Sequence, residues 1–410
     1  MKFSTITRVA SLILAYGFMS LFFSTNANAT SQFARKYQVS CTTCHTAFPR
    51  LTAFGEDFKR NGYQWPGDAP DGAKKGKIAL ADDLAIDQVG EWLGARLSLT
   101  PLKNTTNKRT VNGGTESQFD VGNSNWVQFF VAGSITKNVS IFIENEFEKG
   151  GMKFNWYYLN FTNLYGTYVN FQTGNLSPVD FTSYSDRLRM WGKSAVLNLN
   201  ASGGNGESSA NVRAPRPGIQ YYGYTGPLMW FAGIDNGKDS SSTTNDKNYW
   251  AGLKVTMPYS VSHALDGSSM SYHYYTGVDT ADTATNQKTN NFNRHTLAAN
   301  IRYQSLDVQA VYQYGTDDNY ALTATDVKKT FSGETIVAAY STPTLYYVLQ
   351  YDRIDSTDIP TIEVSKVSPS IWYFVAANFK AGLTGTVDLL SNDANHKQQH
   401  SASLEIRAMF

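Results

Sequence analysis

The residues with the most distinctive chemistry form the run Cys41-Thr42-Thr43-Cys44-His45, which contains both cysteines of the 410-residue chain. The spacing C-x-x-C-H is typical of covalent haem c attachment. In that chemistry both thiols form thioethers with the porphyrin vinyl groups, and the adjacent imidazole is the proximal iron ligand. The sequence therefore predicts one covalent haem c, with Cys41 and Cys44 as attachment sites and His45 as an axial ligand of the iron.

Three other uses of the same residues are a thioredoxin-like redox pair, half of a zinc site and a structural disulfide. A zinc site needs about four ligands, but the chain has no second cysteine pair, and the next histidine after His45 is His263. A redox C-x-x-C is expected within a βαβ unit, which the sequence does not indicate. The haem interpretation is therefore favoured.

The start of the chain has the features of a secretory leader, predicted over residues 1–29. Lys2 and Arg8 are followed by an apolar run and by the small-residue site Ala27-Asn28-Ala29. Haem c attachment takes place outside the cytoplasm, so the leader and the motif agree. Removing Lys2 and Arg8 leaves 33 basic against 34 acidic residues, a balance that argues against a nucleic-acid partner.

Residues 30–80 form the predicted haem segment. A short helix that would pack one face on the haem is indicated by the apolar residues Leu51, Phe54 and Phe58, bounded by Pro49 and Asn61-Gly62. Residues 67–77 are rich in Gly, Pro, Asp and Lys and read as a linker.

The haem segment lacks a conventional sixth iron ligand, because neither His nor Met occurs between His45 and Met152. The haem is then five-coordinate, or carries water, lysine or another weak ligand, or is completed from elsewhere in the chain. Two barrel residues are candidates for that last role. The alternation of apolar residues around Met229 predicts that its side chain faces the barrel interior. His273 lies in a run of tyrosines, and the sequence does not show which side of that strand faces inward.

Residues 88–410 read as alternating segments of about ten residues, the spacing of membrane barrel strands. In one of them Val139, Ile141, Ile143 and Phe147 alternate with Ser140 and with an acidic row, Glu144, Glu146 and Glu148. Carboxylates suit hard cations such as Fe(II), although ordinary lumen lining paired with arginines such as Arg96 and Arg302 is the favoured interpretation of this row.

About sixteen such segments occur, joined alternately by tight turns and long polar loops. Thr225-Gly226-Pro227 and residues 341–344 are tight, whereas residues 202–209 and 239–246 are long and polar. A soluble sandwich or propeller is disfavoured by the 14% aromatic content, by the lack of a blade repeat and by the final segment, which ends on Phe410. The predicted fold is all-β: an antiparallel barrel of about sixteen strands in the bacterial outer membrane, behind a small, mostly helical haem segment.

The haem segment resembles the fused monohaem cytochrome–porins, which include outer-membrane iron oxidases of neutrophilic iron-oxidising bacteria. The likeness covers about thirty residues: Phe33-Ala34-Arg35-Lys36-Tyr37, Val39-Ser40-Cys41, Cys44-His45, Pro49, Leu51, Phe54-Gly55, Phe58-Lys59 and Gly62-Tyr63. Over the barrel only the architecture agrees. The resemblance implies oxidation of extracellular Fe(II) at the haem, with electrons passed to periplasmic c-type cytochromes. The alternatives are a conduit for a non-iron donor or acceptor, and a diffusion porin with a sensing or gating haem.

Overall fold

The computed structural model describes residues 32–47, 49–66, 78–81, 84–86, 89–108, 114–122, 125–148, 150–184, 187, 192–199, 210–237, 247–283, 286–320, 327–391 and 396–409. The predicted leader, the linker at 67–77, the loops at 202–209 and 239–246, and Phe410 lie outside these ranges.

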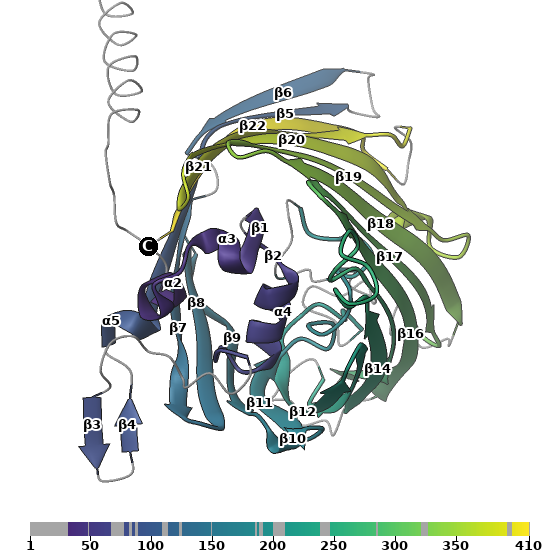
Figure 1. Cartoon of the computed structure of the whole chain (residues 1–410). Coiled ribbons are helices and arrows are strands. Elements are labelled where there is room, and N and C mark those ends of the chain that lie inside the picture. The colour runs from purple at the N-terminus through teal and green to yellow at the C-terminus, as the bar shows by residue number, and fades with distance from the viewer. Residues whose placement is uncertain are drawn as a thin grey trace, which may run out of the picture.

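The alternating part of the chain folds into a closed antiparallel barrel (Figure 1). Among the described residues seventeen strands take part. Two of them, β6 (Thr115–Val121) and β7 (Trp126–Thr136), pair with successive parts of the same strand, β5 (Leu93–Lys108). The ring therefore has sixteen strand positions, which confirms the predicted barrel.

The other strands follow one another around the ring, and β22 pairs with β5 to close it. Their bounds are β8 (Val139–Glu148), β9 (Gly151–Phe161), β11 (Asn170–Leu176), β12 (Arg216–Thr225), β13 (Leu228–Asp235), β14 (Asn248–Thr256), β15 (Ser269–Thr283), β16 (Asn286–Tyr303), β17 (Leu306–Asp317), β18 (Lys329–Ser341), β19 (Leu345–Asp355), β20 (Val364–Ala376), β21 (Phe379–Asp388) and β22 (Gln399–Met409). Outside the ring lie β3 (Ile78–Ala81), β4 (Leu84–Ile86), α5 (Val89–Trp92), β10 (Leu164–Thr167) and the 3-10 helix η1 (Pro360–Ile362).

The two faces of the strands differ in burial, and those of β13 are assigned as the sequence predicts, whereas the sequence did not separate those of β15. On β13, Leu228 and Ile234 are exposed on the outside, whereas Met229 is buried on the inside. On β15, Tyr272 is exposed and His273 is fully buried. Closure pairs the backbone around the whole ring, which lets strands cross a lipid bilayer with an apolar outer band. Among the described residues, no helix has the length and apolar character needed to cross a membrane.

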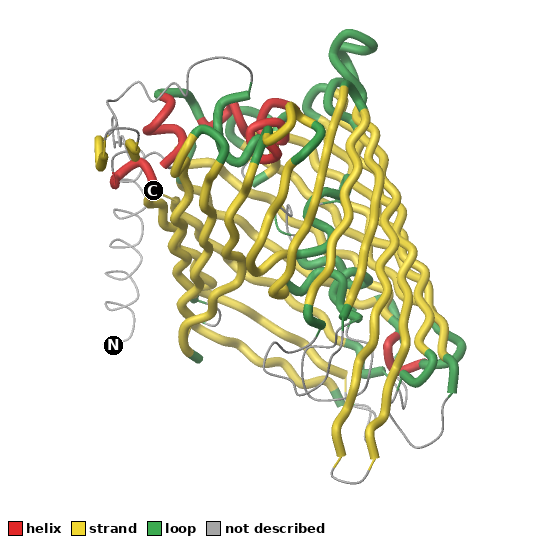
Figure 2. Tube along the Cα trace, turned by 90° about the horizontal axis from the view of Figure 1, so that it is seen from below, coloured by secondary structure: helices red, strands yellow, loops and turns green. Residues whose placement is uncertain are grey.

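The two ends of the barrel differ in their connections (Figure 2). At one end the strands are joined by short turns, such as the two residues between Thr225 and Leu228. At the other end are longer connections, and the described parts of one of them, residues 177–184, 187, 192–199 and 210–215, fold back into the barrel. There Ser194 Oγ lies 2.8 Å from Thr335 Oγ1 on β18. In outer-membrane barrels the short turns face the periplasm and the long loops face outward.

The N-terminal segment lies at the short-turn end and is made of α2 (Gln32–Tyr37), α3 (Cys41–Cys44), β1 (His45–Ala47), β2 (Arg50–Leu51) and α4 (Ala53–Arg60). The predicted helix is thus present but shorter than expected, because Leu51 belongs to β2. Thr52 caps α4 by accepting a hydrogen bond from the Gly55 N–H at 3.0 Å. The chain leaves the helix at Gly62, whose φ of +68° favours glycine.

Candidate functional site: the cavity around Cys41, Cys44 and His45

Four elements of the N-terminal segment, α3, β1, β2 and α4, lie inside the ring of barrel strands (Figure 1). Arg50 Nε lies 2.8 Å from Asp307 Oδ2 on β17. The Tyr222 hydroxyl on β12 donates to the Arg60 carbonyl at 2.7 Å. Asn163, near the short-turn end, donates to Asn61 Oδ1 at 2.8 Å. These contacts, made from several sides of the ring, fix the C-x-x-C-H run inside the lumen.

The C-x-x-C-H run forms one helical turn followed by an extended residue. Cys41 and Cys44, three positions apart on α3, share one side of that turn. His45 ends the turn with φ −128° and ψ 135° and pairs with Leu51 in the small β1–β2 sheet. Behind the turn lies Gly55 of α4, where an added Cβ would stand 2.2 Å from the Cys44 carbonyl oxygen. Only glycine permits α4 to approach the motif this closely.

The His45 ring is oriented by a backbone contact. Its Nδ1 lies 3.2 Å from the Pro49 carbonyl oxygen. Because a carbonyl only accepts, Nδ1 carries the proton in this contact, and the lone pair of the neutral ring is on Nε2. Burial lowers the pKa of His45 to about 4, although the hydrogen bond to Pro49 opposes the shift. The imidazole is therefore neutral at physiological pH, as an iron ligand must be.

Both cysteines are free thiols. Burial, with a smaller contribution from the charge of Cys41, raises the pKa of Cys44 to about 11. Burial also raises the pKa of Cys41. In redox-active C-x-x-C pairs, nearby positive charge or a helix N-terminus instead lowers the pKa of a thiol. The environment therefore argues against a thioredoxin-like redox pair.

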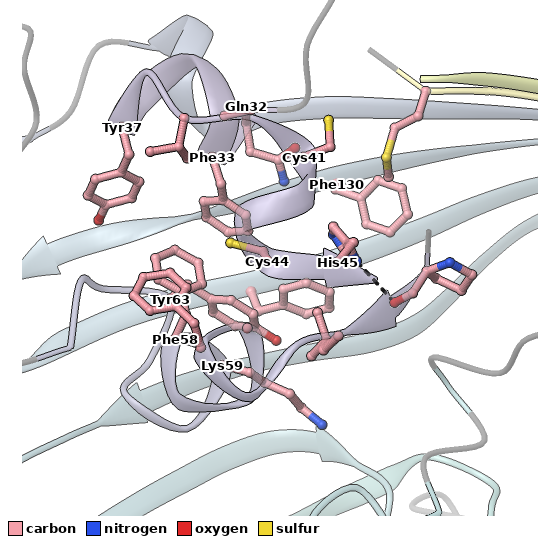
Figure 3. Close-up of a pocket in the computed structure, with 18 of the residues that line it drawn as sticks. Gln32, Phe33, Tyr37, Cys41, Cys44, His45, Phe58, Lys59, Tyr63 and Phe130 are labelled. Carbon is pink, nitrogen blue, oxygen red and sulfur yellow. Dashed lines mark hydrogen bonds between the residues drawn. The ribbon is translucent and has the colours of Figure 1, made fainter. Parts of the chain in front are cut away.

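One cavity joins all three motif side chains (Figure 3). The space inside it is about 150 Å³, which is less than the roughly 300–1,000 Å³ of known ligand pockets. The walls are mostly aromatic and apolar, with Phe33, Tyr37, Leu51, Phe54, Phe58, Tyr63, Trp65, Phe130 and Phe142. The Phe33 and Tyr63 rings stack at a centroid distance of 5.4 Å. Such walls suit a flat apolar ring system.

A second, smaller cavity adjoins the first and shares Cys41, His45, Arg96 and Met409 with it. It is the cationic side of the site, because Lys380 of β21 and Arg407 of β22 also line it. Arg407 Nη2 lies 3.6 Å from Glu405 Oε2. Positive charge beside an apolar cavity complements a ligand that has an apolar body and carboxylate groups.

Neither predicted sixth ligand lies at this site. Met229 points inward as expected, but it lines a different cavity, bounded by α4 and the turn between β14 and β15. His273 is fully buried against Phe231, with ring centroids 6.0 Å apart. The methionine that lines the cavities is Met409, at the end of the last strand. The same alternation that turns Leu404, Ile406 and Ala408 outward would have placed Met409 inward.

A hydrogen-bonded group connects the segment, the barrel and the long loop. The Tyr63 and Tyr158 hydroxyls are 2.8 Å apart. Arg187, on the loop, donates to both of them at 3.1 Å. No sequence pattern pointed to this group, because its members are far apart in the chain and belong to three different parts of the fold.

The acidic row of β8 faces a larger lumen cavity toward the long loops, as its alternation predicted. Its three carboxylates have polar neighbours: Glu144 accepts from Gln128 at 2.7 Å, Glu146 accepts from Asn155 at 2.6 Å, and Glu148 pairs with Lys153. Arg302 instead lies 3.6 Å from Glu56 of α4. The same cavity is lined by Arg96, Lys153, Arg187, Lys193 and Arg213, so its charge is mixed. Among the residues that the structure describes, no cluster of three or more His, Cys, Asp or Glu residues forms a separate metal site.

The residues present fit a covalently attached haem. Two thiols and a neutral imidazole of defined tautomer line one cavity, its walls are aromatic, and cations lie at one side. Cys41 and Cys44 would hold the porphyrin, and His45 would bind the iron through Nε2.

No protein-family model matches the sequence, and no curated protein matches it. Solved structures do resemble the barrel. The anion-selective porin from Comamonas acidovorans aligns with a TM-score of 0.57 at 12% identity, covering 78% of this chain and 99% of that one. OprB from Pseudomonas putida aligns with a TM-score of 0.54 at 8% identity, covering 78% of this chain and 94% of that one. OmpF from Salmonella typhi, in complex with daunomycin, aligns with a TM-score of 0.53 at 13% identity, covering 82% of this chain and 100% of that one.

The fold is that of an outer-membrane porin. The porin chains are matched over almost their whole length. At these identities the likeness concerns the fold alone, and it agrees with the closed ring and with the apolar outer face expected of a barrel in the outer-membrane lipid. The resemblance of residues 33–63 to cytochrome–porins rests on the sequence motifs.

Proposed function

We propose that this protein is an outer-membrane cytochrome–porin that oxidises extracellular Fe(II) at a single c-type haem and passes the electrons to a periplasmic c-type cytochrome. One observation carries the proposal. The only two cysteines of the chain and the histidine next to them line one aromatic cavity inside a porin-type barrel. The iron substrate comes from the resemblance of the haem segment to iron-oxidising cytochrome–porins.

Each residue of the motif has a defined role in this proposal. Cys41 and Cys44 form the two thioethers, and His45 binds the iron through Nε2. The Pro49 carbonyl holds the imidazole by its Nδ1–H, 3.2 Å away, which fixes the tautomer and the ring direction, as hydrogen-bonded partners of ligating histidines do. When bound, haem c supplies a one-electron couple between its ferric and ferrous states.

The arrangement of cavities supports access from both sides of the membrane. The motif cavity and the lumen cavity toward the long loops share Arg96, Glu144 and Arg187 as lining residues. A donor entering from outside therefore reaches the wall of the motif cavity. The N-terminal segment itself lies at the short-turn end, where a periplasmic carrier docks in this proposal.

In this proposal the iron gives up its electron within the lumen and does not pass the N-terminal segment, so only the electron reaches the periplasm across an apolar band roughly 25 Å tall. Each Fe(II) ion releases one electron to become Fe(III), and one carrier takes up that electron. Fe(III) is poorly soluble near neutral pH, so oxidation outside the cell keeps the mineral out of the periplasm.

The test is production of the protein in a bacterial host that matures c-type cytochromes, followed by anaerobic addition of Fe(II) to the purified protein. The haem spectrum is expected to change from oxidised to reduced. Cys41→Ser/Cys44→Ser is the matched control without covalent haem. A haem that stays oxidised despite sufficient driving force contradicts iron oxidation. Faster reduction by another donor from a panel would make the protein a conduit for that donor.

A diffusion porin with a sensing or gating haem is the second candidate, and two observations favour it. The barrel has the porin fold, and a cavity lies inside the lumen on the side of the long loops. Liposome swelling separates it from the first candidate, because substantial sugar flux that is independent of the haem state indicates an open pore. Little or no flux is expected if the N-terminal segment and the inward loop close the lumen.

A further inference from the structure

We infer that the thioether of Met409 is the second axial ligand of the iron that His45 binds. This inference rests on the proposed haem. It concerns a residue at the far end of the chain, which enters the site because β22 closes the ring against β5.

The placement of Met409 follows from the closing strand pair. Met409 pairs with Arg96 of β5, and its side chain lines both the aromatic cavity and the cationic cavity. Both cavities are also lined by Cys41 and His45. Among the described residues that line them, His45 and Met409 are the only imidazole and the only thioether, the pair of side chains that ligates the iron in cytochromes c.

Other potential donors at the site are engaged elsewhere. Lys59 Nζ donates to the Asp180 carbonyl at 2.8 Å. The Tyr63 hydroxyl is bonded to Tyr158 and Arg187. Lys380 Nζ lies 4.5 Å from the centroid of the Trp372 ring. Each would have to give up its present contact to reach the iron.

The backbone of Met409 is held firmly, whereas its side chain is adaptable. Its N–H donates to the Asn378 carbonyl at 2.8 Å, and its own carbonyl accepts from Asn378 Nδ2 at 2.9 Å. Two hydrogen bonds to one turn residue therefore fix the strand end. The unbranched methionine side chain has three rotatable bonds and a soft sulfur, so the thioether can adjust to an iron carried by His45.

The experiment compares the haem proteins carrying Met409→Leu, Met409→His and Met229→Leu with the parent. In the parent, the oxidised protein is expected to show the weak long-wavelength absorption of methionine-ligated ferric haem, and the reduced protein the strongly upfield-shifted methionine methyl resonance in the proton NMR spectrum. Met409→Leu is expected to lose both signals and to have a lower midpoint potential, because methionine ligation raises the potential. Met409→His is expected to give the spectrum of bis-histidine haem.

Met229→Leu is the matched control, because Met229 is an inward-facing barrel methionine that lines another cavity. It is expected to keep both signals. Covalent haem content and heat-modifiable migration in gels verify that each variant is loaded and folded. A loaded, folded Met409→Leu protein with an unchanged spectrum and potential overturns the inference and leaves the proposed function standing. A parent protein without covalent haem overturns both.

Discussion

The Arg50 guanidinium and the Asp307 carboxylate form an ion pair with Nε and Oδ2 2.8 Å apart, and both side chains are almost completely buried. Arg50 belongs to the N-terminal segment and Asp307 to β17 on the barrel wall. Asp307 also accepts a hydrogen bond from Asn300 at 2.7 Å, which holds its carboxylate in place. The pair therefore joins the segment that carries the C-x-x-C-H run to the ring around it.

Asp307→Asn is expected to loosen the N-terminal segment while leaving the barrel folded. Removing one member of a buried pair leaves an uncompensated charge, at a cost of about 3–5 kcal/mol. The measurement is the rate at which a protease cuts the segment in the purified protein. Asp355→Asn is the control, since the Arg353–Asp355 pair is half exposed and such pairs contribute about 0–1 kcal/mol. Equal cleavage rates in the two variants would refute the anchoring role.

Gly55→Ala is expected to push the Cys44 turn away from α4 and to lower the yield of covalent haem. The new Cβ would meet the Cys44 carbonyl oxygen at 2.2 Å, and overpacking of this kind costs about 1–3 kcal/mol. Gly90→Ala is the matched control, because nothing lies within 4 Å of its added Cβ. The readout is haem per polypeptide after purification, and similar values for both variants would show that the close approach is unimportant.

Substitution of the motif residues is expected to separate attachment from ligation. Cys41→Ser/Cys44→Ser should abolish covalent haem, and either single change should leave one thioether and a reduced yield. His45→Ala should keep the thioethers but change the iron spectrum. Intact-protein mass and visible spectra provide the measurement. Full covalent loading of the double variant would exclude these cysteines as attachment sites.

Glu56 is expected to make docking of the N-terminal segment sensitive to acid. Burial alone raises the pKa of Glu56, but the charges of Lys254, Lys59, Arg302 and Arg50 outweigh it and lower the pKa to about 2. A carboxyl whose folded pKa is depressed stabilises the folded state above its unfolded pKa, and that contribution is lost as the pH falls through the folded value. The loss is therefore expected between about pH 4.5 and pH 2.

The check is protease sensitivity of the segment across that pH range in the parent and in Glu56→Gln. The variant should already be less protected at pH 7, because Arg302 loses its carboxylate partner and the other three cations lose a nearby negative charge. Its protection should also vary less between pH 4.5 and pH 2. A variant with the same pH profile as the parent would show that another group controls the acid response.

The barrel was predictable because lipid outside and polar groups inside impose a period of two on every strand. On β8 this alternation placed Glu144, Glu146 and Glu148 correctly on the lumen side. The tight turns at Gly226-Pro227 and after Ser341 were likewise predictable from their turn-forming residues. The helix that follows the motif, α4, was expected to include Leu51, but its N-cap is Thr52 and it therefore begins at Ala53.

Contacts between distant parts of the chain were not predictable, because no local pattern encodes them. The described parts of the connection between β11 and β12 fold inward without any periodic signal in the sequence, and Arg187 meets Tyr63 and Tyr158 only through that fold. The sequence analysis did not identify Met409, although the alternation of the last strand places its side chain inward. Its proximity to His45 depends on which strand closes the ring, and closure follows from the strand count and not from any single segment.

The closing of β22 on β5 also sets an order of events during biogenesis. The cavity walls around Cys41 and Cys44 come from both ends of the chain, through Arg96 on β5 and Met409 on β22. Once these strands pair, the walls that they supply stand on one side of the two thiols. In the proposed cytochrome–porin, haem is therefore expected to be attached before these strands pair, and insertion into the membrane would then enclose it.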